Sequence, residues 1–182
     1  MVLNAPVKKT MVPINVTHTA IVTEKIHSQL LFPGSRNMHG ALPQASTNLR
    51  HTLSTLISFF AESYKSTFGF NDGPPLHDAL TIAYVAQPEL FKVTRHRVDI
   101  ELTGTHSIGE TIVDVWKYRP CDDTWGRNGR NCNVVDYMDV GFHNLLNNRQ
   151  SLTSVAHFQV TGFFDMFLEA VSTCDKVTPL NK

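Results

Sequence analysis

The sequence has no excess of charge of either sign. Its 182 residues include 16 lysines and arginines against 16 aspartates and glutamates. A surface devoted to nucleic acid or to anionic lipid requires an excess of basic side chains. The sequence also contains no apolar run near the roughly 18 residues that span a membrane. We therefore expect neither nucleic acid nor a membrane among its partners.

Cysteine is scarce, and its number and spacing favour free thiols over a disulfide framework. The three cysteines are Cys121, Cys132 and Cys174, one of them necessarily unpaired and none in a Cys-x-x-Cys spacing. The start of the chain lacks the uninterrupted apolar stretch of a secretory signal, since Lys8 and Lys9 interrupt it. These features predict free thiols and a reducing, cytoplasmic location.

No repeat, low-complexity tract or flexible linker divides the chain, which predicts one domain over residues 1–182. Apolar residues at helical spacing predict helices over 24–31, 47–67 and 163–171, and a buried helix over 79–86. Apolar or alternating runs predict a buried strand at 11–17, a strand at 133–138, and a hairpin of 98–102 with 111–118. This mixture indicates an α/β fold.

One segment, Gly73 to Leu80 (GPPLHDAL), concentrates the residues suited to chemistry. Its two prolines restrict the backbone, so His77 and Asp78 reach the start of a helix in a defined orientation. The imidazole can exchange a proton near neutral pH, and a carboxylate at the positive end of a helix stays ionised and can bind a metal. In the alternative interpretation Asp78 only caps the helix and His77 only packs beside it.

Several stretches resemble the nucleoside N-ribohydrolases, with the inosine/uridine-preferring branch as the best match. They are FNDGPPLHDALTIAYVAQPELF (70–91), RVDIELTGTHSIGETIVDVW (97–116), MVPINVTHTAIVT (11–23) and FFDMFLEAV (163–171). The resemblance implies a Rossmann-like α/β fold with a mainly parallel sheet, truncated at its N-terminal half, with a C-terminal antiparallel hairpin. The chain is then a single partial domain.

The resemblance also implies an activity and site residues. Family members hydrolyse the N-glycosidic bond of nucleosides such as uridine or inosine, giving ribose and the free base, with one bound Ca²⁺. His77 matches the histidine that protonates the leaving base, and Asp78 matches a calcium ligand. Tyr64 matches an aromatic residue lining the base side of the pocket. Such an activity would serve nucleoside catabolism and pyrimidine salvage.

Two departures from the family pattern limit this expectation. The Asp-x-Asp-Pro-Gly-x-Asp-Asp motif, which supplies most calcium ligands and the water-activating base, does not occur in the sequence. With Asp78 alone calcium coordination is incomplete, so we expect the chain by itself to be inactive. Residues 142–162 form an atypical insertion before the last helix, for which a retained intron is one hypothesis.

Two functional hypotheses remain open at this point. In the first, the chain is part of a nucleoside hydrolase whose remaining carboxylates come from a longer product or a complementing chain. In the second, it is a non-catalytic truncated homologue that acts as an interaction or oligomerisation module. An incompletely covered sheet exposes an apolar edge, which favours a homo-oligomer in either case.

Overall fold

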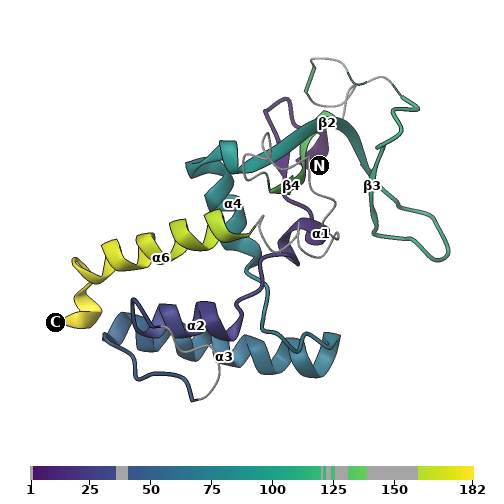
Figure 1. The fold of residues 1–182 in the computed structure, drawn as a ribbon. Coiled ribbons are helices and arrows are strands. Elements are labelled where there is room, and N and C mark those ends of the chain that lie inside the picture. Colours follow the sequence, from purple (N-terminus) through teal and green to yellow (C-terminus); the bar gives the residue numbers. More distant parts are fainter. Residues whose placement is uncertain (1, 36–40, 120, 122–123, 126–130, 139–159) are drawn as a thin grey trace, which may run out of the picture. The chain divides into compact units, whose positions relative to one another are not determined.

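The computed structural model describes residues 2–35, 41–119, 121, 124–125, 131–138 and 160–182. It divides into two compact units, one formed by residues 1–16 and 91–139 and the other by residues 17–90 and 140–182. The first contains the β-sheet and the second contains most of the helices (Figure 1). The predicted insertion at 142–162 lies outside the described residues except for its last three positions.

The first unit contains a four-stranded sheet in the order β1-β4-β2-β3. The strands are β1 (Thr10–Met11), β2 (Phe91–Ile100), β3 (Thr111–Val113) and β4 (Asn131–Met138). Only the pairing of β1 with β4 is parallel among these strands, so the mainly parallel sheet implied by the resemblance is not what this part of the chain forms. The predicted hairpin is confirmed as β2 paired with β3, although β3 is shorter than expected.

Apolar side chains from all four of these strands form the core of the sheet unit. Val98, Cys132 and Val134 are buried together, and Leu3, Met11 and Val113 pack against them. The alternation that predicted a half-buried strand therefore holds at Val98. It fails at Ile100 and Leu102, which are exposed at the end of β2 and beyond it.

The strand predicted over residues 11–17 is wrong for most of its length. Strand β1 ends at Met11, and the one-turn helix α1 (Ile14–Thr17) follows. Pro13 has no N–H to donate to a ladder, and its carbonyl instead accepts a hydrogen bond from the Val16 N–H at 2.9 Å. The apolar run had suggested a strand because periodicity alone cannot distinguish a short strand from a helical turn.

The second unit is built on helices α2 (Glu24–Leu31), α3 (Asn48–Phe68), α4 (His77–Ala86) and α6 (Thr161–Asp175). The hydroxyls of Thr23 and Thr47 accept hydrogen bonds from backbone N–H groups in the first turns of α2 and α3, as expected of N-caps. Gly69 ends α3 in the left-handed conformation, with φ of 74°. The predicted helices are thus confirmed, with α6 extending further in both directions than expected. Within the described residues no helix is both long and apolar enough to cross a membrane.

Helix α4 is only partly buried, although its composition predicted a buried helix. Leu80 and Ala83 are buried, whereas Ile82 and Val85 on the same helix are 69% and 77% exposed. A helix with apolar side chains on every side is normally covered on every side. The exposed face of α4 is therefore an apolar surface that the described part of the chain leaves uncovered.

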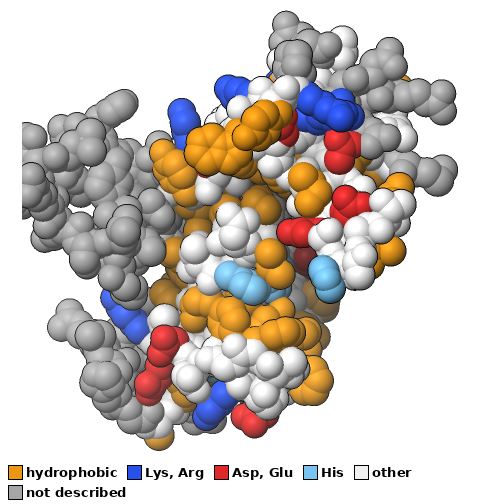
Figure 2. All heavy atoms as spheres, turned by 90° about the vertical axis from the view of Figure 1, so that its right-hand side faces the viewer, with side chains coloured by type: hydrophobic (Ala, Val, Ile, Leu, Met, Phe, Trp, Pro, Cys, Tyr) orange, Lys and Arg blue, Asp and Glu red, His pale blue; other side chains and the backbone are white. Residues whose placement is uncertain are grey.

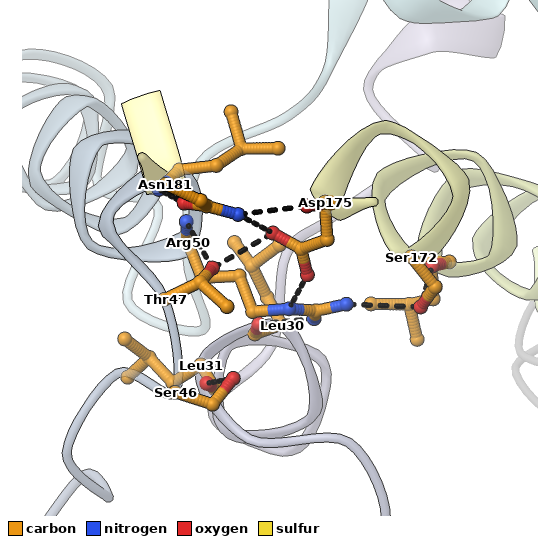
Figure 3. A network of polar contacts seen from close by, with 10 residues as sticks. Leu30, Leu31, Ser46, Thr47, Arg50, Ser172, Asp175 and Asn181 are labelled. Atoms are coloured by element: carbon orange, nitrogen blue, oxygen red, sulfur yellow. Dashed lines mark hydrogen bonds and ion pairs between the residues drawn. The ribbon is translucent and has the colours of Figure 1, made fainter. Parts of the chain in front are cut away.

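A buried arginine connects three helices of the second unit (Figure 3). Arg50 of α3 is 1% exposed, and its guanidinium pairs with the Asp175 carboxylate at the end of α6. It also donates to the Leu30 carbonyl of α2 at 2.6 Å and to the Ser172 hydroxyl at 2.9 Å. The Thr47 hydroxyl donates to the same carboxylate at 2.7 Å. Burial of an arginine is costly unless its charge and its nitrogens have partners, and here the charge is paired and each guanidinium nitrogen donates at least one hydrogen bond.

Candidate functional site

Two chain segments that are distant in sequence lie side by side in the second unit. The N–H of Leu76 donates to the carbonyl of Ala20 at 3.0 Å, and the N–H of Val22 donates to the carbonyl of Pro74 at 2.9 Å. These bonds hold the residues after α1 against the residues just before α4. The ends of the two helices, and the side chains on them, are therefore brought together.

Gly73 permits this approach. Its φ is +132°, a conformation that side chains rarely adopt, and a Cβ placed there would lie 2.0 Å from the carbonyl oxygen of Val22. Only glycine fits a backbone that comes so close to another. The glycine of the GPPLHDAL segment is thus a structural requirement for the placement of His77, four residues later.

Both ring nitrogens of His77 face hydroxyl groups. Nδ1 lies 2.7 Å from the Thr17 hydroxyl, and Nε2 lies 2.7 Å from the Tyr64 hydroxyl. Tyr64 comes from the end of α3, so three separate segments converge on one imidazole. The structure brings together His77 and Tyr64, two of the three residues that the sequence singled out. It also brings in Thr17, which the sequence analysis did not identify.

Aromatic rings surround the imidazole. The ring of His18 lies 5.3 Å from that of His77 and 5.0 Å, edge-on, from that of Phe70. Phe70 also meets Tyr64 edge-on at 5.7 Å. Aromatic pairs of this geometry are favourable and limit the movement of the rings. His18 and Phe70 lie inside two segments of the family resemblance, but no spacing in the sequence could place their rings beside His77.

The surroundings favour the neutral imidazole. Partial burial lowers the pKa of His77 below its usual value of 6.5, and the charge of His18 lowers this pKa further, while the Asp78 carboxylate raises it. The neutral form of His77 therefore persists to a lower pH than that of an ordinary histidine.

Asp78 is exposed in the first turn of α4. It does not cap the helix, because Leu76 occupies the N-cap position and makes no side-chain capping bond. The alternative in which Asp78 is only a cap is therefore wrong, although its charge still lies at the favourable end of the helix dipole.

The described residues do not make up a calcium site around Asp78. Calcium takes about six to eight oxygen ligands. Within the described ranges no group of three or more His, Cys, Asp or Glu side chains is placed to hold a metal ion. Asp78 can contribute one carboxylate, and the donors around it do not fit the ion by themselves.

A depression of about 390 Å³ lies near this cluster, lined among others by Phe70, Gly73 and Pro74. His77, Tyr64 and Asp78 are not among the residues that line it. The depression is therefore not formed by the side chains that the sequence singled out.

Comparison with known proteins decides the family. The sequence profile described as "Inosine-uridine preferring nucleoside hydrolase" matches residues 1–143. The chain belongs to this nucleoside hydrolase family. The match includes all three candidate site residues and ends at the second position of the predicted insertion at 142–162.

Relatives and solved structures agree with this membership. A probable ribonucleoside hydrolase of Dictyostelium discoideum is 39% identical over 116 residues, which are 64% of this chain and 32% of that protein. The pyrimidine-specific ribonucleoside hydrolase RihA of Shewanella woodyi is 31% identical over 150 residues, 80% of this chain and 41% of that protein.

The fold agrees as well. The structure of a purine-preferring ribonucleoside hydrolase from Gardnerella vaginalis superimposes with a TM-score of 0.65 at 20% identity, covering 97% of this chain and 43% of that one. This supports the expected nucleoside hydrolase fold of mixed α/β type. The chain spans about a third to two fifths of the length of the curated relatives it matches.

Proposed function

We propose that this chain carries the leaving-group side of a nucleoside hydrolase site, acting on ribonucleosides such as uridine or inosine. One observation carries the proposal: in a member of this family, His77 is held by hydroxyls on both ring nitrogens, beside Asp78, at the start of a helix. The reaction would belong to nucleoside catabolism and pyrimidine salvage.

The proposed chemistry divides between this chain and groups outside it. Water adds to C1′ of the ribose, and the N-glycosidic bond breaks with its electron pair going to the base. His77, in its protonated form, gives this base a proton and returns to the neutral imidazole, which is general acid catalysis, while a group outside this chain takes the proton that the water loses. Tyr64, whose hydroxyl lies 2.7 Å from Nε2, is proposed to line the base side of the pocket and to hold the ring.

Asp78 is proposed as one ligand of a calcium ion in a site that another polypeptide segment completes. This rests on the position of the carboxylate next to His77 and on the absence of sufficient donors among the described residues. The family's Asp-rich motif is likewise not in the sequence. The chain alone therefore lacks the group that would activate water.

The test compares the chain alone with a completed domain. The purified 182-residue chain should release no ribose from uridine or inosine in calcium-containing buffer. Fusing it to the part of the Dictyostelium relative that it does not match should give a hydrolase that binds calcium in calorimetry. Turnover by the chain alone would contradict the division of the site, and an inactive, calcium-free fusion that is correctly folded would contradict the catalytic proposal.

A second candidate function is an interaction module, and exposed apolar side chains favour it. On α3, Leu56, Phe59 and Phe60 are 52%, 70% and 52% exposed. Hydrophobic side chains lie at the surface over much of the described part of the face in Figure 2. Exposed apolar patches mark association surfaces. In this function the chain self-associates and binds no calcium even when the missing carboxylates are supplied.

A further inference from the structure

We propose that Thr17 is a positioning residue for His77. Its hydroxyl accepts the Nδ1 proton, which fixes the orientation of the ring and leaves Nε2 as the atom that exchanges a proton with the substrate. The inference rests on the proposed function, because it identifies what prepares His77 for that role.

Thr17 is placed rigidly enough to orient a ring. It is the last residue of α1, and the residue is only 3% exposed. Its carbonyl accepts a hydrogen bond from the Ala20 N–H at 3.1 Å, which starts the turn into the segment paired with residues 74–76. A threonine side chain has few accessible rotamers because it is branched at Cβ. The hydroxyl 2.7 Å from Nδ1 therefore has little freedom to move away.

The two hydroxyls on the ring differ in their access to solvent. Thr17 is buried on the Nδ1 side, whereas Tyr64, on the Nε2 side, is only half-buried. A substrate can therefore approach Nε2 more easily than Nδ1. A neutral imidazole carries one N–H and one lone pair, so the partner of one nitrogen decides what the other nitrogen can do.

We take the Thr17 hydroxyl as the acceptor of its bond with His77, and the position of Thr17 on a helical turn supports this choice. A threonine hydroxyl on a helical turn commonly donates to a carbonyl one turn earlier, and its oxygen then remains an acceptor. Nδ1–H donating to that oxygen leaves the lone pair on Nε2, where the Tyr64 hydroxyl donates to it. A hydrogen bond to the rear nitrogen is also how proteins fix the tautomer of histidines that bind metals.

The experiment measures the tautomer directly in the full 182-residue chain. The protein is labelled with ¹⁵N-histidine, and long-range ¹H–¹⁵N spectra are recorded at pH 8, where an ordinary imidazole is neutral. The His77 signals are assigned by their loss in His77→Gln. We expect Nδ1 protonated and Nε2 unprotonated. A wild-type ring protonated mainly on Nε2 overturns the proposal.

Three variants distinguish a positioning role of Thr17 from a general loss of structure. Thr17→Val keeps the shape but removes the hydroxyl, and should reduce the preference for Nδ1–H by about threefold to tenfold, the worth of one hydrogen bond. Thr17→Ser restores the hydroxyl and should restore the preference. Tyr64→Phe should leave Nδ1 protonated. An unchanged tautomer in a Thr17→Val chain with wild-type circular dichroism refutes the role of Thr17. If Thr17→Val does not fold, loss of the Nδ1 preference in Tyr64→Phe refutes it instead.

The same variants distinguish this inference from the proposed function. The tautomer measurement needs no substrate, so it stands or falls independently of catalysis. In the completed hydrolase, Thr17→Val should lower kcat with little change in KM, and Thr17→Ser should recover kcat. A tautomer that depends on Thr17 in a completed domain without hydrolysis contradicts the proposed function but supports the positioning of His77.

Discussion

Replacement of Gly73 by alanine tests how the site is assembled. Gly73 precedes the two prolines that lead to His77, and its backbone passes against the Val22 carbonyl. An added Cβ would lie 2.0 Å from that oxygen, whereas ordinary contacts begin near 3.4 Å. The two segments must therefore separate by more than 1 Å or the backbone must rotate away from its φ of +132°.

The loss of unfolding free energy in Gly73→Ala is the sum of two contributions. A side chain in such a backbone conformation costs about 1–3 kcal/mol. Separation of the segments also weakens the hydrogen bond from Val22 N–H to the Pro74 carbonyl, worth about 0.5–1.5 kcal/mol. We expect Gly73→Ala to lower the free energy of unfolding of the helical unit by about 2–4 kcal/mol.

Gly69→Ala is the matched control. Gly69 also has a positive φ, of 74°, but nothing lies within 4 Å of the position that its Cβ would occupy. This variant has backbone strain without a clash, and should cost only about 1 kcal/mol. The difference in unfolding free energy between the two variants therefore gives the cost of disturbing the close approach of Gly73 to Val22.

Urea unfolding with two probes gives the measurement. Most helices belong to the second unit, so circular dichroism at 222 nm reports on it, while both tryptophans, Trp116 and Trp125, belong to the first unit. Gly73→Ala should shift the dichroism midpoint with little effect on tryptophan fluorescence. Equal costs for Gly73→Ala and Gly69→Ala would refute the proposed packing of the two segments.

Three further predictions concern stability and association. Asp175→Ala should destabilise the helical unit by about 3 kcal/mol in urea, since Arg50 stays buried without its carboxylate; a loss below about 1 kcal/mol contradicts this. Burial lowers the pKa of His27, so the folded state binds its proton less tightly than the unfolded state. The free energy of unfolding should then fall as the pH decreases below 6.5, and should fall less in His27→Gln, measured at pH 7.5 and 5.5. The chain should self-associate in sedimentation velocity, and Phe59→Lys/Phe60→Lys should reduce it; a wild-type monomer argues against association.

The sequence predicted the local elements of the fold more successfully than their burial. Threonine at positions 23 and 47 and glycine at position 69 are residue types that favour helix starts and ends, and helices α2 and α3 begin after Thr23 and Thr47 and α3 ends at Gly69. The prediction that α4 is buried was wrong in part. Its apolar composition indicates that the helix needs to be covered, but does not show that the described residues cover it. The prediction of a strand over residues 11–17 was wrong because Pro13 prevents the strand from continuing beyond Met11.

The candidate site was predicted only in part, because a sequence shows neighbouring residues and motifs but not contacts between distant segments. His77 and Asp78 are adjacent in a motif, and Tyr64 was matched through the resemblance. Thr17 and His18 approach His77 only because Gly73 lets distant segments touch, a contact between residues 60 positions apart. The Arg50 network likewise joins residues more than 120 positions apart, and a single sequence carries no signal for such pairs.

The rate of uridine hydrolysis by the completed hydrolase, with and without His77→Gln, tests the central claim most directly. The account predicts turnover in calcium-containing buffer that falls by about 100-fold or more when His77 is replaced, since general acid catalysis contributes about 10²–10⁴-fold. Calcium affinity should not change, because glutamine leaves Asp78 in place. Equal turnover by the two proteins would contradict the role of His77 as the acid that protonates the leaving base.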